Sequence, residues 1–415
     1  MLKKLFPNVY EGWIVVIASS FIMMLSGSTF FYGLSAIFTS LLIDFNWSVA
    51  SLSLAFSLRT EVQGLTGPII GLSIDRIGPK FTIVMGILIA GIALFCLSKI
   101  TNLVQFYIVM LISALGIGAA GGQVGMAAVV TWFSKKRSRA LAIMSVGGGI
   151  SGALVFIVAW LVEFYGWRTA VQILSVYYLI VGLFFAINIR SRPDDHHQPI
   201  DGVTLESEDN IPHVAEGMGL RQALRTKSLW AISTSTSLCL FAGVPVILLT
   251  IPFLESLEYP KTTASIGMIA FTISTVLGRL GSGYLGDKYG NKLILVFGYT
   301  LVSIGTGLLF FAQDIYSTMF FLLIIGPGFG ATIPLRASLV AEYFGTINFG
   351  TINGFVVFIS TLGAVFGPWI VGMIVDSSGS YSLGWLISGI VALFAVPVLA
   401  IFVKPIDKHG VTDHE

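Results

Sequence analysis

The sequence predicts an all-α membrane protein with twelve transmembrane helices arranged in two pseudo-symmetric six-helix halves. Its 415 residues are 55% hydrophobic and only 11% charged, whereas soluble domains carry about 25% charged residues. Twelve apolar runs are long enough to cross a bilayer, which needs about 20 residues per helix. A polar loop motif of the first half also recurs in the second. These observations exclude a soluble enzyme.

The first six apolar runs define an N-terminal half, residues 1–190. We expect its helices at Trp13–Phe38, Val49–Ile74, Phe81–Ser98, Leu103–Thr131, Ala140–Val162 and Ala170–Ile189. The first run begins beside Glu11 and has no cleavage pattern, so it is predicted to be a retained span rather than a signal peptide.

The last six runs define a C-terminal half, residues 229–415. We expect its helices at Leu229–Leu254, Thr262–Leu285, Leu293–Ala312, Tyr316–Ala341, Phe349–Val375 and Leu383–Val403. Residues 191–228 form a polar linker with an acidic patch at Glu206–Asp209. Its last part, Leu220–Leu229, is predicted to be an amphipathic helix at the membrane interface, with Arg221, Arg225 and Lys227 toward lipid headgroups.

The placement of Lys and Arg predicts the orientation, because cytoplasmic loops are enriched in both. With the N-terminus inside, seventeen of these residues fall on the inner side, and only Lys99, Arg168 and Lys261 fall on the outer side. We therefore expect a multi-pass protein of the cell (inner) membrane with both termini and the linker in the cytoplasm.

The remaining polar residues exclude several kinds of site. A net charge of +2 is too small to indicate a nucleic-acid partner. Cys96 and Cys239 lie in separate apolar runs, so neither a disulfide scaffold nor a thiolate metal site is predicted. All five histidines lie outside the apolar runs, which excludes a histidine relay or a histidine-ligated metal inside the membrane. We expect no metal and no cofactor, and we expect a monomer.

The repeated loop motif follows the second and the eighth predicted helix. Residues 71–80 read GLSIDRIGPK and residues 283–292 read GYLGDKYGNK, an offset of 212 residues (75 to 287). Asp75 and Asp287 lie at helix ends, where they can accept bonds from a neighbouring helix N-terminus or pair with a cation. With Arg76 and Lys288 they form what we call the conformational latch, expected to break when the halves move. Two parallel halves around a mid-depth site are typical of secondary transporters.

Three stretches carry a family resemblance. The pattern G-x-x-x-D-[RK]-x-G-x-[RK] in both halves resembles the loop motif of the major facilitator superfamily. Glu11-Gly12-Trp13 is similar to the start of the first helix in monocarboxylate carriers. Residues 132–142 (WFSKKRSRALA), which run into Gly147–Gly149, resemble a signature that those carriers share with oxalate/formate antiporters. The resemblance implies the superfamily's twelve-helix fold, alternating access and a carboxylate substrate.

Arg279 is the leading substrate-binding candidate. A charge at the bilayer centre costs several kcal/mol, so an arginine there is a functional candidate. Arg279 lies about 12 Å along the eighth helix from Asp287, with Thr275 and Gly283 rather than carboxylates one turn away. Its planar guanidinium can bind a carboxylate through two bonds; an interhelical structural pair is the alternative. The resemblance favours the first, because monocarboxylate and oxalate carriers have their substrate-binding arginine in this helix.

Three further charges fall within spans. Glu61 is the only carboxylate well inside a span, which makes it a proton-coupling candidate; the alternative is a polar partner on another helix. Arg59 is a second proton-coupling candidate, although residues two apart do not share a helix face. Alternatively, Arg59 lines an outer cavity or gate. Arg336, near the inner end of its helix, is expected to extend to the interface.

The other substrate-binding candidates depend on depth and alignment. Gln123 and Thr275 lie at depths comparable with Arg279, although single polar residues in spans more often link helices than bind ligands. Ser360 stands where oxalate carriers have a lysine, and Thr275 where animal monocarboxylate carriers have an acid. Three aromatic residues could enclose an apolar substrate tail: Phe30, Phe31 and Tyr32. The glycine-rich stretch 326–330 indicates either close helix packing or a wide cavity.

The sequence thus predicts a secondary active transporter, not an enzyme. The expected substrate is a small organic monocarboxylate such as lactate or pyruvate, because one central cation balances one anionic group. Proton symport by alternating access is expected, so the partners are the carboxylate, a proton and the lipid bilayer. The main alternative is an anion exchanger of the oxalate/formate type, which needs no proton. A membrane sensor that retains the fold is a third possibility.

Overall fold

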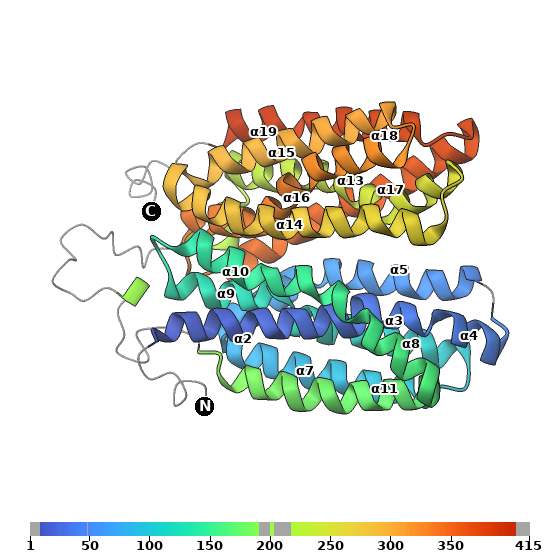
Figure 1. Ribbon diagram of the computed structural model, residues 1–415. Coiled ribbons are helices and arrows are strands. Elements are labelled where there is room, and N and C mark those ends of the chain that lie inside the picture. The colour runs from blue at the N-terminus through green and yellow to red at the C-terminus, as the bar shows by residue number, and fades with distance from the viewer. Residues whose placement is uncertain (1–8, 48, 191–199, 203–216, 404–415) are drawn as a thin grey trace, which may run out of the picture.

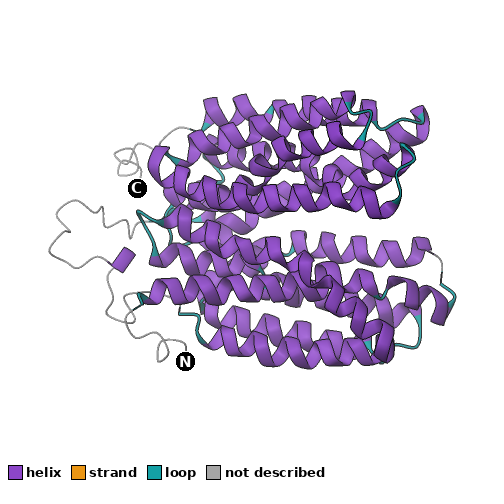
Figure 2. Cartoon of the chain, viewed as in Figure 1, coloured by secondary structure: helices purple, strands orange, loops and turns teal. Residues whose placement is uncertain are grey.

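The computed structural model describes residues 9–47, 49–190, 200–202 and 217–403, and each regular element in these ranges is a helix (Figure 2). Two helical bundles lie side by side with their helices running in the same general direction (Figure 1). The chain enters the first helix and leaves the last one at the same end of the molecule. We call this end the inner end and the opposite one the outer end. The acidic patch Glu206–Asp209 lies outside the described residues.

The N-terminal half contains six spans, several of them built from more than one helix. In chain order its elements are α2 (Glu11–Ser26), the π-helical turn η1 (Gly27–Tyr32), α3 (Gly33–Ala36), α4 (Phe38–Phe45), α5 (Val49–Leu65), α6 (Gly67–Ile77), α7 (Pro79–Leu97), α8 (Leu103–Ala120), α9 (Gly122–Trp132), α10 (Arg137–Ile150), the 3₁₀ turn η2 (Ser151–Leu154) and α11 (Val155–Ile187). At Gly166 the φ angle is 74°, and there α11 turns back, so its two parts belong to the fifth and sixth spans.

The C-terminal half has longer, less interrupted helices. After the short turn η4 (Ile200–Gly202), its elements are α12 (Leu220–Ala223), α13 (Lys227–Ser256), α14 (Lys261–Tyr289), α15 (Asn291–Leu308), η6 (Leu309–Phe311), α16 (Ile315–Phe344), α17 (Phe349–Ser378), α18 (Ser382–Leu393) and α19 (Ala395–Phe402). The predicted interfacial helix is therefore wrong in extent. The Thr226 hydroxyl accepts a bond from the Leu229 N–H (3.3 Å), so the capped helix α13 already begins at Lys227.

The twelve-span prediction is confirmed once interrupted helices are joined. Ten helices in the described ranges are long and apolar enough to cross a membrane. The second and fifth spans are absent from these ten because each is broken into shorter pieces. The second span bends between α5 and α6, where Pro68 has no N–H to donate to the preceding turn. The fifth is interrupted by η2.

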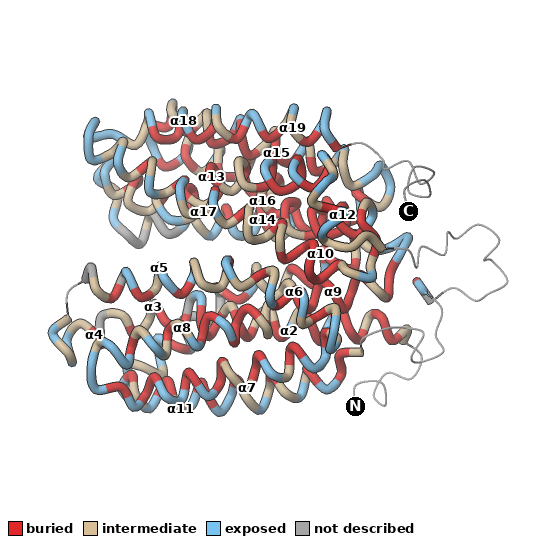
Figure 3. Tube along the Cα trace, turned by 180° about the vertical axis from the view of Figure 1, so that it is seen from behind, coloured by how far each residue is buried: buried red, intermediate tan, exposed pale blue. Residues whose placement is uncertain are grey.

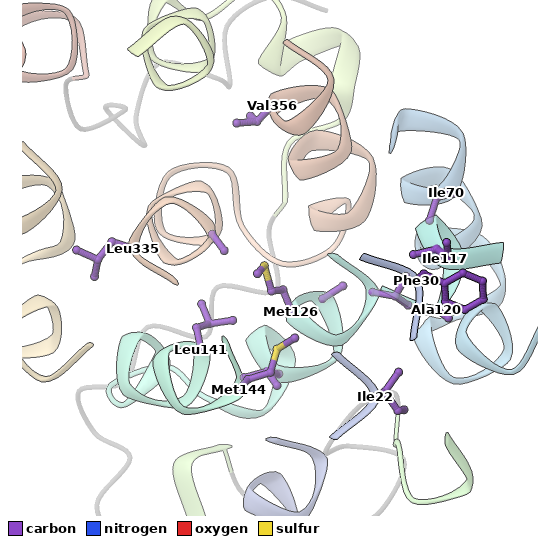
Figure 4. Packing of buried hydrophobic residues seen from close by; sticks show 14 of the residues in the cluster. Ile22, Phe30, Ile70, Ile117, Ala120, Met126, Leu141, Met144, Leu335 and Val356 are labelled. Atoms are coloured by element: carbon purple, nitrogen blue, oxygen red, sulfur yellow. The ribbon is translucent and has the colours of Figure 1, made fainter. Parts of the chain in front are cut away.

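The two halves pack most tightly at the inner end. Buried residues are dense around α6, α9 and α10 (Figure 3), where α6 contacts α17 and α10 contacts α14 of the other half. Leu141 of α10 and Leu335 of α16 are buried near the boundary between the halves, with Met126 and Met144 beside them (Figure 4). The surface of the two bundles, by contrast, exposes many large apolar side chains along the helices of both halves. Apolar exposure on this scale fits a surface that faces lipid.

Candidate functional site

Asp75 binds the first turn of a helix in the opposite half. Its carboxylate accepts hydrogen bonds from the backbone N–H groups of Gly350 (2.9 Å) and Thr351 (2.8 Å) and from the Thr351 hydroxyl (2.5 Å). These residues begin α17, where N–H groups have no partner within the helix and the helix dipole favours a negative charge. Asp75 therefore joins the two halves at the inner end.

Asp287 makes the equivalent contact in the other direction. It accepts bonds from the backbone N–H groups of Ser138 (2.9 Å) and Arg139 (3.3 Å) at the start of α10, and it pairs with the Arg139 guanidinium (3.0 Å). The capped residues repeat at the same offset as the aspartates, since Ser138 and Gly350 are 212 residues apart (138 to 350). The repeated motif and its binding partner are thus both duplicated.

The basic members of the conformational latch do not take part in these contacts. Arg76 and Lys288 are exposed, and the Lys288 ammonium lies 5.1 Å from the ring centre of Tyr289. The cation at the Asp287 contact is instead Arg139, whose guanidinium also lies 4.7 Å from the ring centre of Tyr284. The sequence indicates Arg139 only as part of the family signature and as a basic residue of the inner side, although that stretch opens the helix that Asp287 caps.

The glycines of the motif have two distinct roles. A Cβ atom added to Gly71 would overlap the carbonyl oxygen of Gly350, and one on Gly283 would lie 2.8 Å from the carbonyl oxygen of Ser138. These glycines therefore allow the helices of the two halves to approach. Gly78 and Gly290 have φ angles of 84° and 94°, a left-handed conformation that favours glycine. They turn the chain directly into the next helix.

Arg279 lies where α14 meets α10 of the opposite half. Its side chain is buried, with 7% of its surface exposed, and Nη1 donates a hydrogen bond to the backbone carbonyl of Ser145. A Cβ atom added to Gly149 would lie 3.4 Å from this nitrogen and 2.7 Å from Val276 Cγ2. Gly149, the last glycine of the run in the family signature, therefore leaves the space beside the guanidinium.

Arg279 also lies at the outer limit of the tight contact between the halves. The outermost glycines whose added Cβ would touch the opposite half are Gly64, against Thr361, and Gly149, against Val276 and Arg279. Along α14, Arg279 is about 15 Å from the inner end at Tyr289. Figure 1 shows α10 and α14 adjacent at this boundary. The structure is thus closed at the inner end, with a buried cation where the closed region ends.

Arg59 and Glu61 point in different directions and do not form an ion pair. Arg59 is 4% exposed and donates to the carbonyl of Phe30 (2.7 Å), inside the π-helical turn η1. Glu61 is half-buried, one turn outside Gly64 on the helix face that meets α17. It has no hydrogen-bond or ion-pair partner among the side chains that the structure describes. Arg59 thus belongs to the interior of its own half rather than to an outer cavity.

The predicted polar lining residues make mainly structural contacts in this state. Gln123 donates to the carbonyls of Gly67 (3.2 Å) and Gly350 (3.5 Å), so it lies in the contact of α6 with α17. Thr275 is buried one turn from Arg279, and its hydroxyl donates to Phe271 on its own helix (2.8 Å). Ser360 is also buried and donates to its own helix at Val356 (2.5 Å).

The aromatic candidates of the first span are separated. Phe30 is 1% exposed and packs edge-to-face on Tyr178, with ring centres 5.1 Å apart. Phe31 is 60% exposed. The side chain of Tyr32 lies outside the described part of the chain. Phe30 thus lies in the interior of the N-terminal half, whereas Phe31 is exposed.

The glycine-rich stretch 326–330 serves close helix packing. A Cβ atom added to Gly326 would lie 2.5 Å from the Ser274 hydroxyl, and one on Gly330 would overlap the Thr275 carbonyl. Both neighbours belong to α14, the helix of Arg279. These contacts therefore fix α16 against the helix that carries the buried cation.

Comparison with known proteins decides the family. The family model of the Major Facilitator Superfamily matches residues 16–269 and 237–415. The chain belongs to the Major Facilitator Superfamily. Monocarboxylate transporter 13 of Rattus norvegicus is 27% identical over 408 residues, covering 95% of this chain and 89% of the relative. The cis,cis-muconate transport protein of Acinetobacter baylyi is 23% identical over 400 residues, covering 94% of each chain.

A solved structure agrees with this assignment. A double-tryptophan mutant of XylE superimposes with a TM-score of 0.81 at 16% identity, covering 95% of this chain and 96% of that one. At this identity the likeness shows the fold alone. The predicted superfamily fold is confirmed, and this superfamily member is a transporter rather than an enzyme.

Two charged residues of this superfamily member have roles that sequence reasoning missed. Asp201, in the linker, accepts bonds from the backbone N–H groups of Ser134 (3.1 Å), Lys135 (2.7 Å) and Lys136 (3.2 Å), which precede α10. Arg336 was expected to reach the interface but is 7% exposed. It lies about 12 Å from the inner end of α16, which is too deep for that.

Proposed function

We propose that this transporter carries a small organic monocarboxylate, of the lactate or pyruvate kind, together with a proton. The observation that carries the proposal is Arg279, a buried guanidinium at the boundary between the halves and at the outer limit of their closed contact. A substrate that enters from the outer end would meet this cation before the closed region. The relatives that carry monocarboxylate or muconate transport in their names support a carboxylate substrate.

The chemistry of the guanidinium supports carboxylate binding. Arg279 donates to the neutral carbonyl of Ser145. A guanidinium has five N–H donors, and bonds to a carboxylate are stronger than bonds to a neutral carbonyl. A carboxylate can therefore bind in two bonds while α10 stays in place, or displace the carbonyl and loosen the contact between α10 and α14. The second outcome would couple binding to movement of the halves.

The other candidate residues divide by their surroundings. We assign Thr275, one turn from Arg279, and the exposed Phe31 to the substrate path, with Tyr32 beside it in sequence. We assign Phe30, Gln123 and Ser360 to helix packing, because each is satisfied or buried within helix contacts and, unlike Thr275, none lies on the helix of Arg279. Among these candidates Arg279 supplies the cation, which supports a carboxylate substrate.

The conformational latch would control alternating access. In the closed inner end, Asp75 and Asp287 each bind the first turn of a helix across the boundary. Opening the inner end must break both sets of bonds. We propose that their two-fold arrangement lets the halves separate as rigid bodies without unfolding either helix.

We assign proton coupling to Glu61. Its half-buried carboxyl lies just outside the closed contact, on the face that meets α17, and it has no partner among the described side chains. Protonation would remove its charge and so ease closure of the outer end against α17. Arg59, held by the Phe30 carbonyl, would fix the first span beside it.

We assign the transporter to the cell (inner) membrane as a monomer with the inner end in the cytoplasm. The basic residues support this orientation, because Arg76, Lys80, Lys135 and Lys136 are all exposed at the inner end.

Counterflow in proteoliposomes tests the proposed function. Purified protein would be reconstituted with internal unlabelled lactate, and uptake of labelled carboxylates would be measured with and without an inward proton gradient. We expect exchange of short monocarboxylates, net accumulation only with the gradient, and no transport of the matching amides. Exchange without any effect of the gradient would favour the anion exchanger, and absence of carboxylate transport would reject the proposal.

A further inference from the structure

A shallow groove lies at the inner end between the start of α13 and the end of α19. Its volume is about 430 Å³, and its walls include Arg225, Lys227, Trp230, Thr234 and Phe402. This volume falls within the range of about 300–1,000 Å³ that is usual for sites of small ligands. The groove is separate from Arg279 and from the conformational latch, and the proposed transport cycle does not use it.

The two ends of the groove differ in chemistry. Arg225 and Lys227 form a basic rim, both side chains are exposed, and no acidic residue is among those that line the groove. Ala231, Val398 and Phe402 supply an apolar floor. The groove therefore suits a molecule with an anionic head and an apolar chain.

The position of the groove matches the boundary of a membrane. It opens at the first turns of the candidate span Lys227–Ser256 and at the last turn of the candidate span Ser382–Phe402. The basic rim thus lies at headgroup depth, and the apolar floor continues toward the acyl chains. Trp230 is 47% exposed, and its indole N–H donates to the Leu224 carbonyl (2.9 Å), which fixes the ring as a wall. Tryptophan is enriched at this depth.

We propose that this groove binds one anionic phospholipid of the inner-end leaflet. The phosphate would lie between Arg225 and Lys227, because basic pockets between transmembrane helices on the cytoplasmic side recognise such headgroups. One acyl chain would run past Thr234 along Val398 and Phe402. The lipid would join the α12–α13 turn to the last helix.

Native mass spectrometry of the full chain in detergent tests the site. The protein would be titrated with phosphatidylglycerol, and with phosphatidylcholine of the same acyl chains, and bound lipids would be counted. We expect one phosphatidylglycerol to bind first and at least tenfold more tightly than phosphatidylcholine. The double variant Arg225→Gln/Lys227→Gln should lose about thirtyfold in affinity for this first lipid.

Two further variants separate a built groove from general attraction of charge. Lys135→Gln/Lys136→Gln removes the same charge from exposed side chains of the other half and should leave the first lipid bound. Thr234→Trp keeps both cations but fills the acyl path, and it should also lose the lipid. Equal losses in both double variants, or full binding by Thr234→Trp, would overturn the proposal. Binding of inorganic phosphate that depends on Arg225 and Lys227, with no selective binding of phosphatidylglycerol, would show an anion site without lipid, which also overturns it.

Discussion

Replacing Asp75 by Asn should shift the protein from a state closed at the inner end toward one open there. Asp75 accepts three hydrogen bonds from the first turn of α17. Bonds to a charged group contribute about 1.5–3 kcal/mol each, and a negative charge at a helix N-terminus contributes about 0.3–1 kcal/mol. Asn keeps one carbonyl oxygen but turns an NH₂ group toward N–H donors. We expect the closed state to lose about 2 kcal/mol, about a thirtyfold change in the equilibrium.

Double electron–electron resonance can measure this shift. Spin labels on Lys80→Cys and Leu293→Cys would report the separation of the halves at the inner end, because both positions are exposed there. The background would lack the native Cys96 and Cys239. In Asp75→Asn the longer-distance population should grow by about the predicted factor. The free energy of unfolding of each half should change little.

Matched variants decide whether the contact across the halves is responsible. Asp287→Asn should cause a shift of similar size, because it caps α10 in the equivalent way. Asp314→Asn is the control, since Asp314 caps α16 within one half by accepting from the Ser317 N–H (2.7 Å). An unchanged distance distribution in Asp75→Asn, or an equal shift in Asp314→Asn, would refute the reasoning.

Three other perturbations have expected outcomes. Gly149→Ala should lower carboxylate transport at least tenfold, because its Cβ would crowd the contact of Arg279 with α10. Gly281→Ala is the control and should transport normally, because a Cβ atom at Gly281 would meet nothing within 4 Å. Equal activity of the two variants would argue against the contact. Arg59→Met should lower the free energy of unfolding by about 1–3 kcal/mol, since it leaves the buried Phe30 carbonyl without its donor. Thermal unfolding measures this change. A loss of stability as small as that of the exposed control Arg76→Gln would contradict the structural role of Arg59. Glu61→Gln should abolish accumulation driven by a proton gradient but preserve exchange at equal pH, and accumulation at the wild-type level would remove Glu61 from the coupling.

The architecture was predictable because its determinants repeat in the sequence. Apolar runs separated by charges fix the spans, and the duplicated motif fixes the two halves. The bonds that Asp75 and Asp287 accept from helix N-termini were one of the two possibilities that their location at helix ends allowed, pairing with a cation being the other. The interruptions within spans could not be predicted, because the 3₁₀ turn η2 and the π-helical turn η1 contain no strong sequence signal.

The detailed contacts of polar residues could not be predicted, because they depend on which helix lies opposite. Gln123 and Ser360 lie in spans at plausible depths, yet one links helices across the boundary and the other bonds to its own helix. Arg59 was assigned with Glu61 to proton coupling or to an outer cavity, but it binds a backbone carbonyl in another span of its own half. Arg336 was expected at the interface because it lies near the inner end of its helix, but its burial depends on how α16 packs against neighbouring helices.

Equilibrium binding to purified Arg279→Lys tests the central claim most directly. Isothermal titration calorimetry with lactate or pyruvate would compare this variant with the unmodified protein, and the uncharged amide of the ligand would serve as control. Lysine keeps the charge but lacks the planar fork that binds a carboxylate through two bonds. We predict that the unmodified protein binds the acid and not the amide, and that Arg279→Lys stays folded but binds the acid at least tenfold more weakly. Equal affinity of the two proteins for the acid would contradict the assignment of Arg279 as the carboxylate site.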